Sequence, residues 1–173
     1  MTLVPGDPAS LSACAVTVAA VARRLREGAA AAGPALADLG EGWGGRSSVA
    51  LRRRGDSLVG AIATTADRLD DLGRVLQDHA TDLAGLLARA RALEERAMAA
   101  GLEVRDGRVL PPWGVLAEAD AGTDRSRREA AAALQAELDL VLSQHRRRRD
   151  FVLRTLRASG ETLAEVSHAL RRG

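Results

Sequence analysis

The sequence contains no lysine, no asparagine and no tyrosine, and Cys14 is its single cysteine. Aromatic side chains make up 2% of the 173 residues, and they are Trp43, Trp113 and Phe151. A single cysteine excludes an intrachain disulfide. A core with so few large rings has to be built from small aliphatic side chains, which closely packed helices accommodate well. The scarcity of aromatics therefore favours an all-α protein over a β-sandwich or an α/β enzyme.

The chain also lacks a strong excess of charge of either sign. All 25 basic residues are arginine, 23 residues are acidic, and the formal net charge is +2. Exclusive use of arginine is typical of codon bias in a high-GC genome, for example an actinobacterial one, so it is weak evidence for nucleic-acid binding. Such binding is further disfavoured because aromatic side chains on which bases could stack are nearly absent.

No apolar run approaches the roughly 20 residues that a transmembrane helix needs, so we expect no membrane span. Residues 11–14 read Leu-Ser-Ala-Cys, like a lipobox, but the segment before them is short and broken by Pro5 and Pro8. A lipoprotein or secretory signal would have a basic region and an apolar run there. We therefore expect Cys14 to be a small helix residue, no Sec-type signal peptide, and a cytoplasmic protein that is exported, if at all, by another machine.

The first helix is expected to begin at Asp7-Pro8, because Asp suits the N-cap and Pro the first helical position. Apolar or small residues then alternate in steps of four and three, which is a coiled-coil-like seam. Gly33-Pro34 predicts a kink or a short break in this helix. Residues 40–45 contain four glycines, which permit a tight reversal and end the helix.

A second helix, with the same spacing of apolar residues, is expected from about Ser47 to Ala100. If it is unbroken, it is roughly 80 Å long at 1.5 Å per residue, so we expect an elongated molecule. His79 also falls on this seam, and we expect it to be a hydrogen-bonded core residue rather than a metal ligand. The leucines expected to form the seam or a partner interface are Leu58, Leu69, Leu72, Leu76, Leu83 and Leu86.

Beyond residue 101 the pattern changes twice. Alternating residues around Asp106-Gly107 predict a β-hairpin at about 102–110, with Val104 opposite Val109. From Arg125 the pattern is helical again, as one long helix or two nearly collinear ones with a bend at Ser159-Gly160. The candidate exposed recognition patch on this helix consists of His145, Arg146, Arg147, Arg148 and Arg149.

Residues with recognisable catalytic, cofactor or metal chemistry are missing from the sequence. The histidines His79, His145 and His168 have no His or Cys at ligand spacing. Nucleophile elbows and phosphate-binding loops are absent as well. Adjacent acids such as Asp70-Asp71 point about 100° apart on a helix, so they do not readily share a proton. We expect a non-enzymatic protein without metal or cofactor.

The arrangement helix, Trp43-Gly44-Gly45, helix resembles the WXG family of type VII (ESX) secretion substrates. Those proteins are short helical hairpins that reverse at a Trp-x-Gly turn and form homodimeric or heterodimeric four-helix bundles. The resemblance covers about residues 8–100, and residues 101–173 are similar to the added helices of longer WXG-like proteins. The tyrosine of the family's C-terminal export signal is missing, so either a partner carries that signal or the resemblance is one of structure only.

The predicted fold is all-α: an elongated antiparallel helical hairpin, extended by a third long helical segment in a bundle or coiled coil. The predicted domains are a WXG-like hairpin at 1–100 and a β-hairpin linker with a C-terminal helical arm at 101–173. The resemblance implies a subunit or targeting chaperone of a type VII secreted effector, which pairs as a homodimer or as a heterodimer with an effector or another WXG-like protein. The alternatives are a cytoplasmic coiled-coil scaffold and an Arg-rich, nucleic-acid-associated helical protein.

Overall fold

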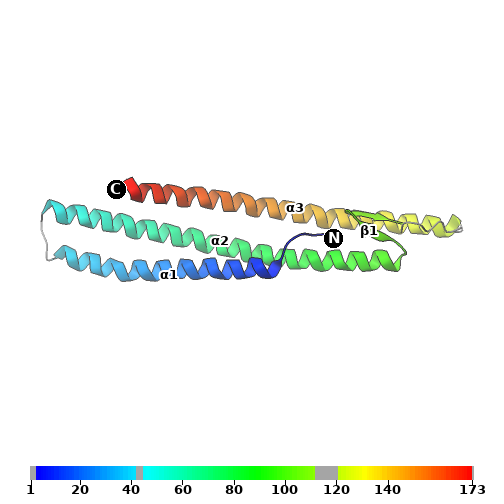
Figure 1. Ribbon diagram of the computed structural model, residues 1–173, viewed down its shortest axis with the longest axis horizontal. Helices are drawn as coiled ribbons and strands as arrows, with labels where there is room; N and C mark the ends of the chain where they lie inside the picture. The colour runs from blue at the N-terminus through cyan, green and yellow to red at the C-terminus, as the bar shows by residue number, and fades with distance from the viewer. Residues whose placement is uncertain (1–2, 42–44, 112–120, 173) are drawn as a thin grey trace. The chain divides into compact units, whose positions relative to one another are not determined.

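The computed structural model describes residues 3–41, 45–111 and 121–172. Over these residues the chain forms long helices and one small antiparallel sheet, so the all-α class predicted from the sequence is confirmed (Figure 1). The elements in chain order are α1 (Pro8–Glu41), α2 (Arg46–Ala99), β1 (Glu103–Arg105), β2 (Arg108–Leu110) and α3 (Ala121–Arg172).

Two compact units share these elements. The β-hairpin unit consists of Met1–Pro8 and His79–Phe151, and the three-helix unit consists of Ala9–Asp78 and Val152–Gly173. Helices α2 and α3 contribute one part to each unit. The sequence suggests a domain boundary near residue 100. Each compact unit is instead assembled from two separate stretches of the chain, so this boundary stays a prediction.

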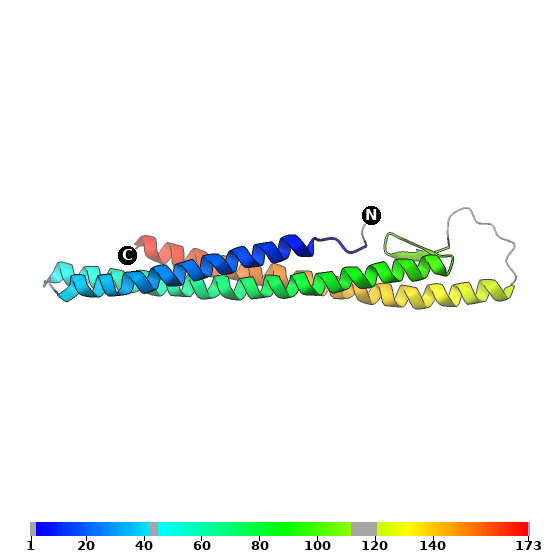
Figure 2. The same ribbon diagram turned by 90° about the horizontal axis from the view of Figure 1, so that it is seen from below.

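In the three-helix unit, α1 and the first part of α2 lie side by side and antiparallel (Figures 1 and 2). Small residues let them approach closely: a Cβ built on Gly73 would lie 3.3 Å from the carbonyl oxygen of Ala15 and 3.6 Å from Cβ of Ala19. Ala15 and Leu76 pack there with Val152 of α3. The core is therefore the thin aliphatic layer that the seam predicts.

Helix α1 runs through Gly33-Pro34 without interruption, so of the kink or short break predicted at this pair the break is wrong, and the kink stays a prediction. Proline removes one hydrogen bond of the helix ladder, but its fixed φ is compatible with a helix. The apolar seam continues beyond it, and Leu36 packs against Gly55 of α2, where a built Cβ would lie 2.9 Å from Leu36 Cδ1. This packing holds the last turns of α1 in helical form.

The reversal between α1 and α2 contains the Trp43-Gly44-Gly45 motif. Trp43 and Gly44 lie outside the described residues. Gly45 has φ +107°, which favours glycine, and its carbonyl oxygen accepts the amide hydrogen of Val49 at 3.2 Å to open α2. Of the glycines predicted to permit the reversal, Gly45 therefore has the expected positive φ.

In the β-hairpin unit, α2 ends in a Schellman motif that the sequence analysis did not predict. The amide of Leu102 donates to the carbonyl of Ala97 at 2.8 Å, the amide of Gly101 donates to Met98 at 3.0 Å, and Gly101 has φ +66°. Leu102 is buried, and the hairpin begins directly after it.

The β1–β2 hairpin has the predicted register, with Val104 paired to Val109. Asp106 and Gly107 both have positive φ, at 50° and 74°, as a two-residue type I′ turn requires. Helix α3 is continuous, which confirms the alternative of one long helix. The buried core of this unit consists of Val4, Ala80, Leu83, Leu86, Ala90, Leu93, Ala97, Leu102, Val109, Leu134, Leu138 and Val141.

Candidate interaction surfaces

The predicted seam leucines divide into a buried and an exposed group. Leu76, Leu83 and Leu86 are buried within the chain, Leu69 and Leu72 are half-buried, and Leu58 is 44% exposed. The buried leucines are covered by the chain's own helices, so little of their surface is open to a partner. Leu58 remains accessible.

Leu58 lines an open groove in the three-helix unit with a volume of about 900 Å³. Leucines from three helices meet there, and Leu51 and Leu170 are also exposed. Arg53 and Arg54 are the charged side chains of its lining. We call this surface the apolar groove and define it by its apolar lining residues Leu36, Ala50, Leu51, Leu58, Ala169 and Leu170.

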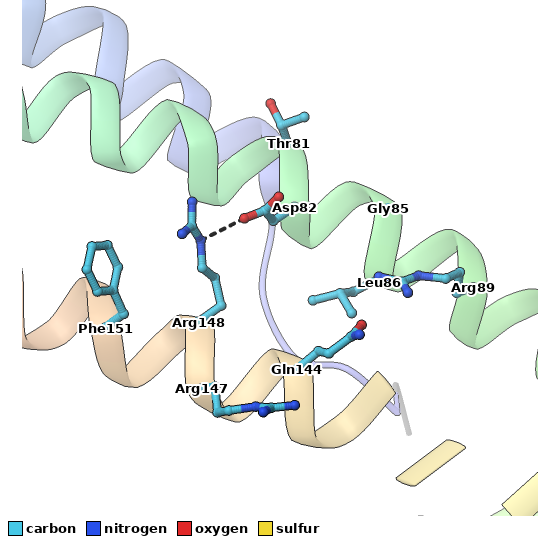
Figure 3. Close-up of a pocket in the computed structure, with 9 residues that line it drawn as sticks. All are labelled: Thr81, Asp82, Gly85, Leu86, Arg89, Gln144, Arg147, Arg148 and Phe151. Carbon is cyan, nitrogen blue, oxygen red and sulfur yellow. Dashed lines mark ion pairs between the residues drawn. The ribbon is translucent and has the colours of Figure 1, made fainter. Parts of the chain in front are cut away.

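A second groove, of about 550 Å³, lies between α2 and α3 in the β-hairpin unit (Figure 3). It differs from the apolar groove in that a phenylalanine and an aspartate line it beside its arginines. We call it the arginine groove. Its lining residues are Thr81, Asp82, Gly85, Leu86 and Arg89 from α2 and Gln144, Arg147, Arg148 and Phe151 from α3.

One arginine of this groove is engaged by two neighbours. Nε of Arg148 lies 2.6 Å from Oδ2 of Asp82, as an ion pair across the two helices rather than an aligned hydrogen bond. The guanidinium of Arg148 also lies over the ring of Phe151, 5.4 Å from its centroid. Asp82 therefore balances the charge of Arg148, whereas the charges of the other two arginines of the groove remain unbalanced.

Those other arginines, Arg89 and Arg147, form no ion pair within the part of the chain that the structure describes. Arg147 makes one long hydrogen bond, from Nη2 to Oγ of Ser143 at 3.4 Å. Beside them, Oε1 of Gln144 is buried and accepts no hydrogen bond from the described residues. The groove thus presents two uncompensated cations, and the unsatisfied acceptor lies beneath its surface.

Two histidines sit in the core of the same unit. His145 is 6% exposed, so the prediction that it belongs to an exposed patch is wrong. It follows Leu138 and Val141 at helical spacing and shares their buried face. Of the arginine run, Arg147 and Arg148 line the groove, whereas Arg149 pairs with its neighbour Asp150 at 3.0 Å. The run is therefore divided around the helix and is not one patch.

His79 on α2 is likewise 6% exposed, as expected for a seam residue. Its Nδ1 is buried without a hydrogen-bond partner among the described residues, so the expectation that it is fully hydrogen-bonded is wrong. Burial lowers the pKa of His79 below its ordinary value, and the charges of Arg148 and His145 lower this pKa further, against an opposing effect of Asp82. In the folded protein the neutral form of the His79 imidazole is therefore favoured over the charged form.

The described residues contain neither a cluster that could bind a metal ion nor a helix that could span a membrane. Residues 3–41, 45–111 and 121–172 contain no cluster of three His, Cys, Asp or Glu side chains that could hold a metal ion. Cys14 is exposed on α1. Over the same residues, the helices are not apolar enough to cross a lipid bilayer.

No protein-family model, no curated protein and no solved structure matches this chain. The roles of its residues therefore rest on their own chemistry and geometry. Among the described residues, each unit has one inter-helix groove that could receive a partner.

Proposed function

We propose that this protein is a non-enzymatic, WXG-like helical subunit or targeting chaperone that pairs with a type VII (ESX) secreted effector or with another WXG-like protein. The observation that carries the proposal is the antiparallel α1–α2 hairpin, which reverses across the segment that holds Trp43-Gly44-Gly45 (Figure 1). The positive φ of Gly45 is the backbone conformation that such a reversal requires.

The proposed docking surface is the apolar groove, and the proposed occupant is a helix of the partner with a stripe of aliphatic side chains. The groove begins within two helical turns of Gly45, because Ser47 and Leu51 line it. Leu51, Leu58 and Leu170 are exposed in it. Because these leucines are 37–44% exposed, covering the remaining surface of each would contribute about 1 kcal/mol, which favours a helix of matching apolar face.

Deletion of the gene in the native host tests the secretion role. We expect the export or the solubility of a type VII effector to be lost, and re-expression of the wild-type chain to restore it. Unchanged amounts of every type VII effector in the culture medium would contradict the proposal.

Paired substitutions test the docking surface. Leu58→Arg places a charge in the apolar groove, and we expect it to abolish co-purification with the effector or WXG-like partner. Leu140→Arg is the matched control, because Leu140 is a similarly exposed leucine, at 52%, that lines neither groove. Equal retention of the partner by both variants would place the interface elsewhere.

The same experiments separate the alternatives. A homodimer in light scattering that is lost with Leu58→Arg, without any effect on secretion, would indicate a coiled-coil scaffold. Binding of DNA that falls steeply with salt would indicate a nucleic-acid-associated protein.

A further inference from the structure

The arginine groove concentrates positive charge in a unit that has no excess of it overall. Arginines and acidic residues are nearly equal in number over residues 1–8 and 79–151. Three arginines nevertheless converge on one groove with a single carboxylate, that of Asp82 (Figure 3). Because Asp82 pairs with Arg148, the unbalanced charges are those of Arg89 on α2 and Arg147 on α3.

The groove also has an apolar component. Leu86 forms a buried floor, and Phe151 is 42% exposed. Gly85 leaves the groove open, because a Cβ built on it meets no atom within 4 Å. An apolar side chain of a ligand could therefore lie over Gly85 while its neighbours reach the two arginines from opposite sides.

We propose that the arginine groove binds a helical segment of a partner protein in which carboxylates flank an apolar side chain. Arginine binds carboxylates through charge-assisted, often two-point hydrogen bonds, and residues three or four positions apart lie on one face of a helix. This inference concerns a different groove from the apolar one, and it does not depend on whether the partner belongs to a secretion system.

Two observations favour an acidic peptide over a nucleic acid. Aromatic side chains make up only 2% of the sequence, so the chain offers few rings on which successive bases could stack. The ring of Phe151, which could otherwise stack on a base, has the guanidinium of Arg148 over it. A carboxylate with an adjacent aliphatic group matches the remaining surface.

The test uses the full chain and a fluorescein-labelled synthetic helical peptide whose leucine stripe is flanked by glutamates. Fluorescence anisotropy should show binding of this peptide, and a peptide with glutamine in place of each glutamate should bind at least about tenfold more weakly. Equal binding of the two peptides would overturn the proposal, as would failure of the glutamate peptide to bind. A single-stranded oligonucleotide that binds more tightly than the glutamate peptide would also overturn it, in favour of nucleic-acid recognition.

Charge reversal tests the two arginines. The double variant Arg89→Glu, Arg147→Glu should weaken binding of the glutamate peptide by about tenfold or more. The double variant Arg91→Glu, Arg125→Glu is the matched control, because it makes the same change of charge with one exposed arginine of α2 and one of α3 that lie outside the groove. We expect this control to bind the peptide as the wild type does. Equal losses in both variants would show that the peptide responds to overall charge, and this would overturn the proposal.

Steric filling tests the groove independently of charge. Gly85→Leu should block the peptide without disturbing the fold, because the space above Gly85 is open. Gly60→Leu is the matched control, since Gly60 is an exposed glycine of the same helix that is also open and lies outside both grooves. Circular dichroism confirms that both variants are folded. Undiminished binding by Gly85→Leu would overturn the proposal, whereas Leu58→Arg should leave this binding unchanged, so the two grooves are tested separately.

Discussion

Gln135 on α3 is joined to Val109 of β2 by a hydrogen bond in which its side-chain Oε1 accepts the backbone amide of Val109 at 2.8 Å. The same side chain donates through Nε2 to the carbonyl oxygen of Gly107 at 3.1 Å. A lone two-stranded hairpin is at best marginally stable in water. These two bonds, together with the burial of Val109, attach the hairpin to the helix.

Replacing Gln135 by alanine should therefore release the hairpin. We expect the free energy of unfolding to fall by about 1–3 kcal/mol, because the half-buried backbone groups of Gly107 and Val109 lose their partner. Hydrogen exchange at the Val109 amide should accelerate more than exchange in the middle of α3. Gln135→Glu keeps an acceptor for Val109 and loses the donor to Gly107, so its effect should be intermediate. Unchanged exchange at Val109 in Gln135→Ala would contradict this role.

The register of this hairpin follows from local sequence, whereas its attachment does not. Asp106-Gly107 and the alternation around it determine the turn and the Val104–Val109 pair, because a two-residue turn leaves one register. The partner of Val109 is a side chain 26 positions away. Its contribution depends on how α3 packs, and no short-range pattern in the sequence contains that information.

Leu83 and Leu58 are both seam leucines of α2, but their exposures, 1% and 44%, predict different responses to truncation. Leu83→Ala should lower the free energy of unfolding by about 2–5 kcal/mol, because it opens a cavity in the core. Leu58→Ala should change it by about 0.5 kcal/mol or less, as for other surface substitutions. Chemical denaturation measures both. Similar losses in the two variants would mean that Leu58 is covered in solution, as by a second copy of the chain.

Gly73 marks the close approach of α1 and α2, since a Cβ there would already lie 3.3 Å from the carbonyl oxygen of Ala15. Gly73→Leu should lower the free energy of unfolding by about 1–3 kcal/mol through overpacking against this backbone. Gly60→Leu places the same side chain in open space and should be neutral or slightly stabilising, because leucine favours helix more than glycine does. Thermal unfolding of the pair gives the difference. A Gly73 variant as stable as the Gly60 variant would contradict the close packing of the hairpin.

The grooves were harder to predict than the helices. Helix positions follow from the spacing of apolar residues, which is a local property. The short break predicted at Gly33-Pro34 does not occur, because packing against α2 keeps this segment helical. The run His145–Arg149 reads as one charged patch in sequence, but it spans more than one turn of α3, so His145 faces the core while Arg147 and Arg148 face α2. Arg89 and Gly85 were missed altogether, because only the antiparallel pairing of α2 and α3 brings them to the same groove. Leu58 was expected at the seam, and its exposure depends on where α1 and α3 leave α2 uncovered.

His79 should make stability depend on pH in the weakly acidic range. Its pKa in the folded protein is lowered from 6.5 by burial and by the neighbouring Arg148 and His145, with Asp82 opposing. In the unfolded chain the imidazole takes up a proton near pH 6.5, whereas in the folded protein it stays neutral to lower pH. The unfolded state therefore binds more protons as the pH falls below 6.5, and the free energy of unfolding decreases until the pH reaches the folded pKa. Well above pH 6.5 the imidazole is neutral in both the folded and the unfolded state, so His79 causes no such loss of stability.

His79→Leu keeps an apolar side chain on the seam and removes the titrating group, so this part of the pH dependence should disappear. The measurement is urea denaturation of the wild type and the variant between about pH 8 and pH 5. His168→Gln is the control, because His168 is exposed on α3 and its replacement should leave the wild-type profile in place. The buried Nδ1 of His79 also costs stability because it lacks a hydrogen-bond partner among the described residues, whereas leucine leaves no polar atom unpaired. The variant should therefore be at least as stable as the wild type at about pH 6, where the penalty of the buried histidine is partly expressed. A variant whose stability falls with pH as steeply as that of the wild type would assign the acid sensitivity to groups other than His79.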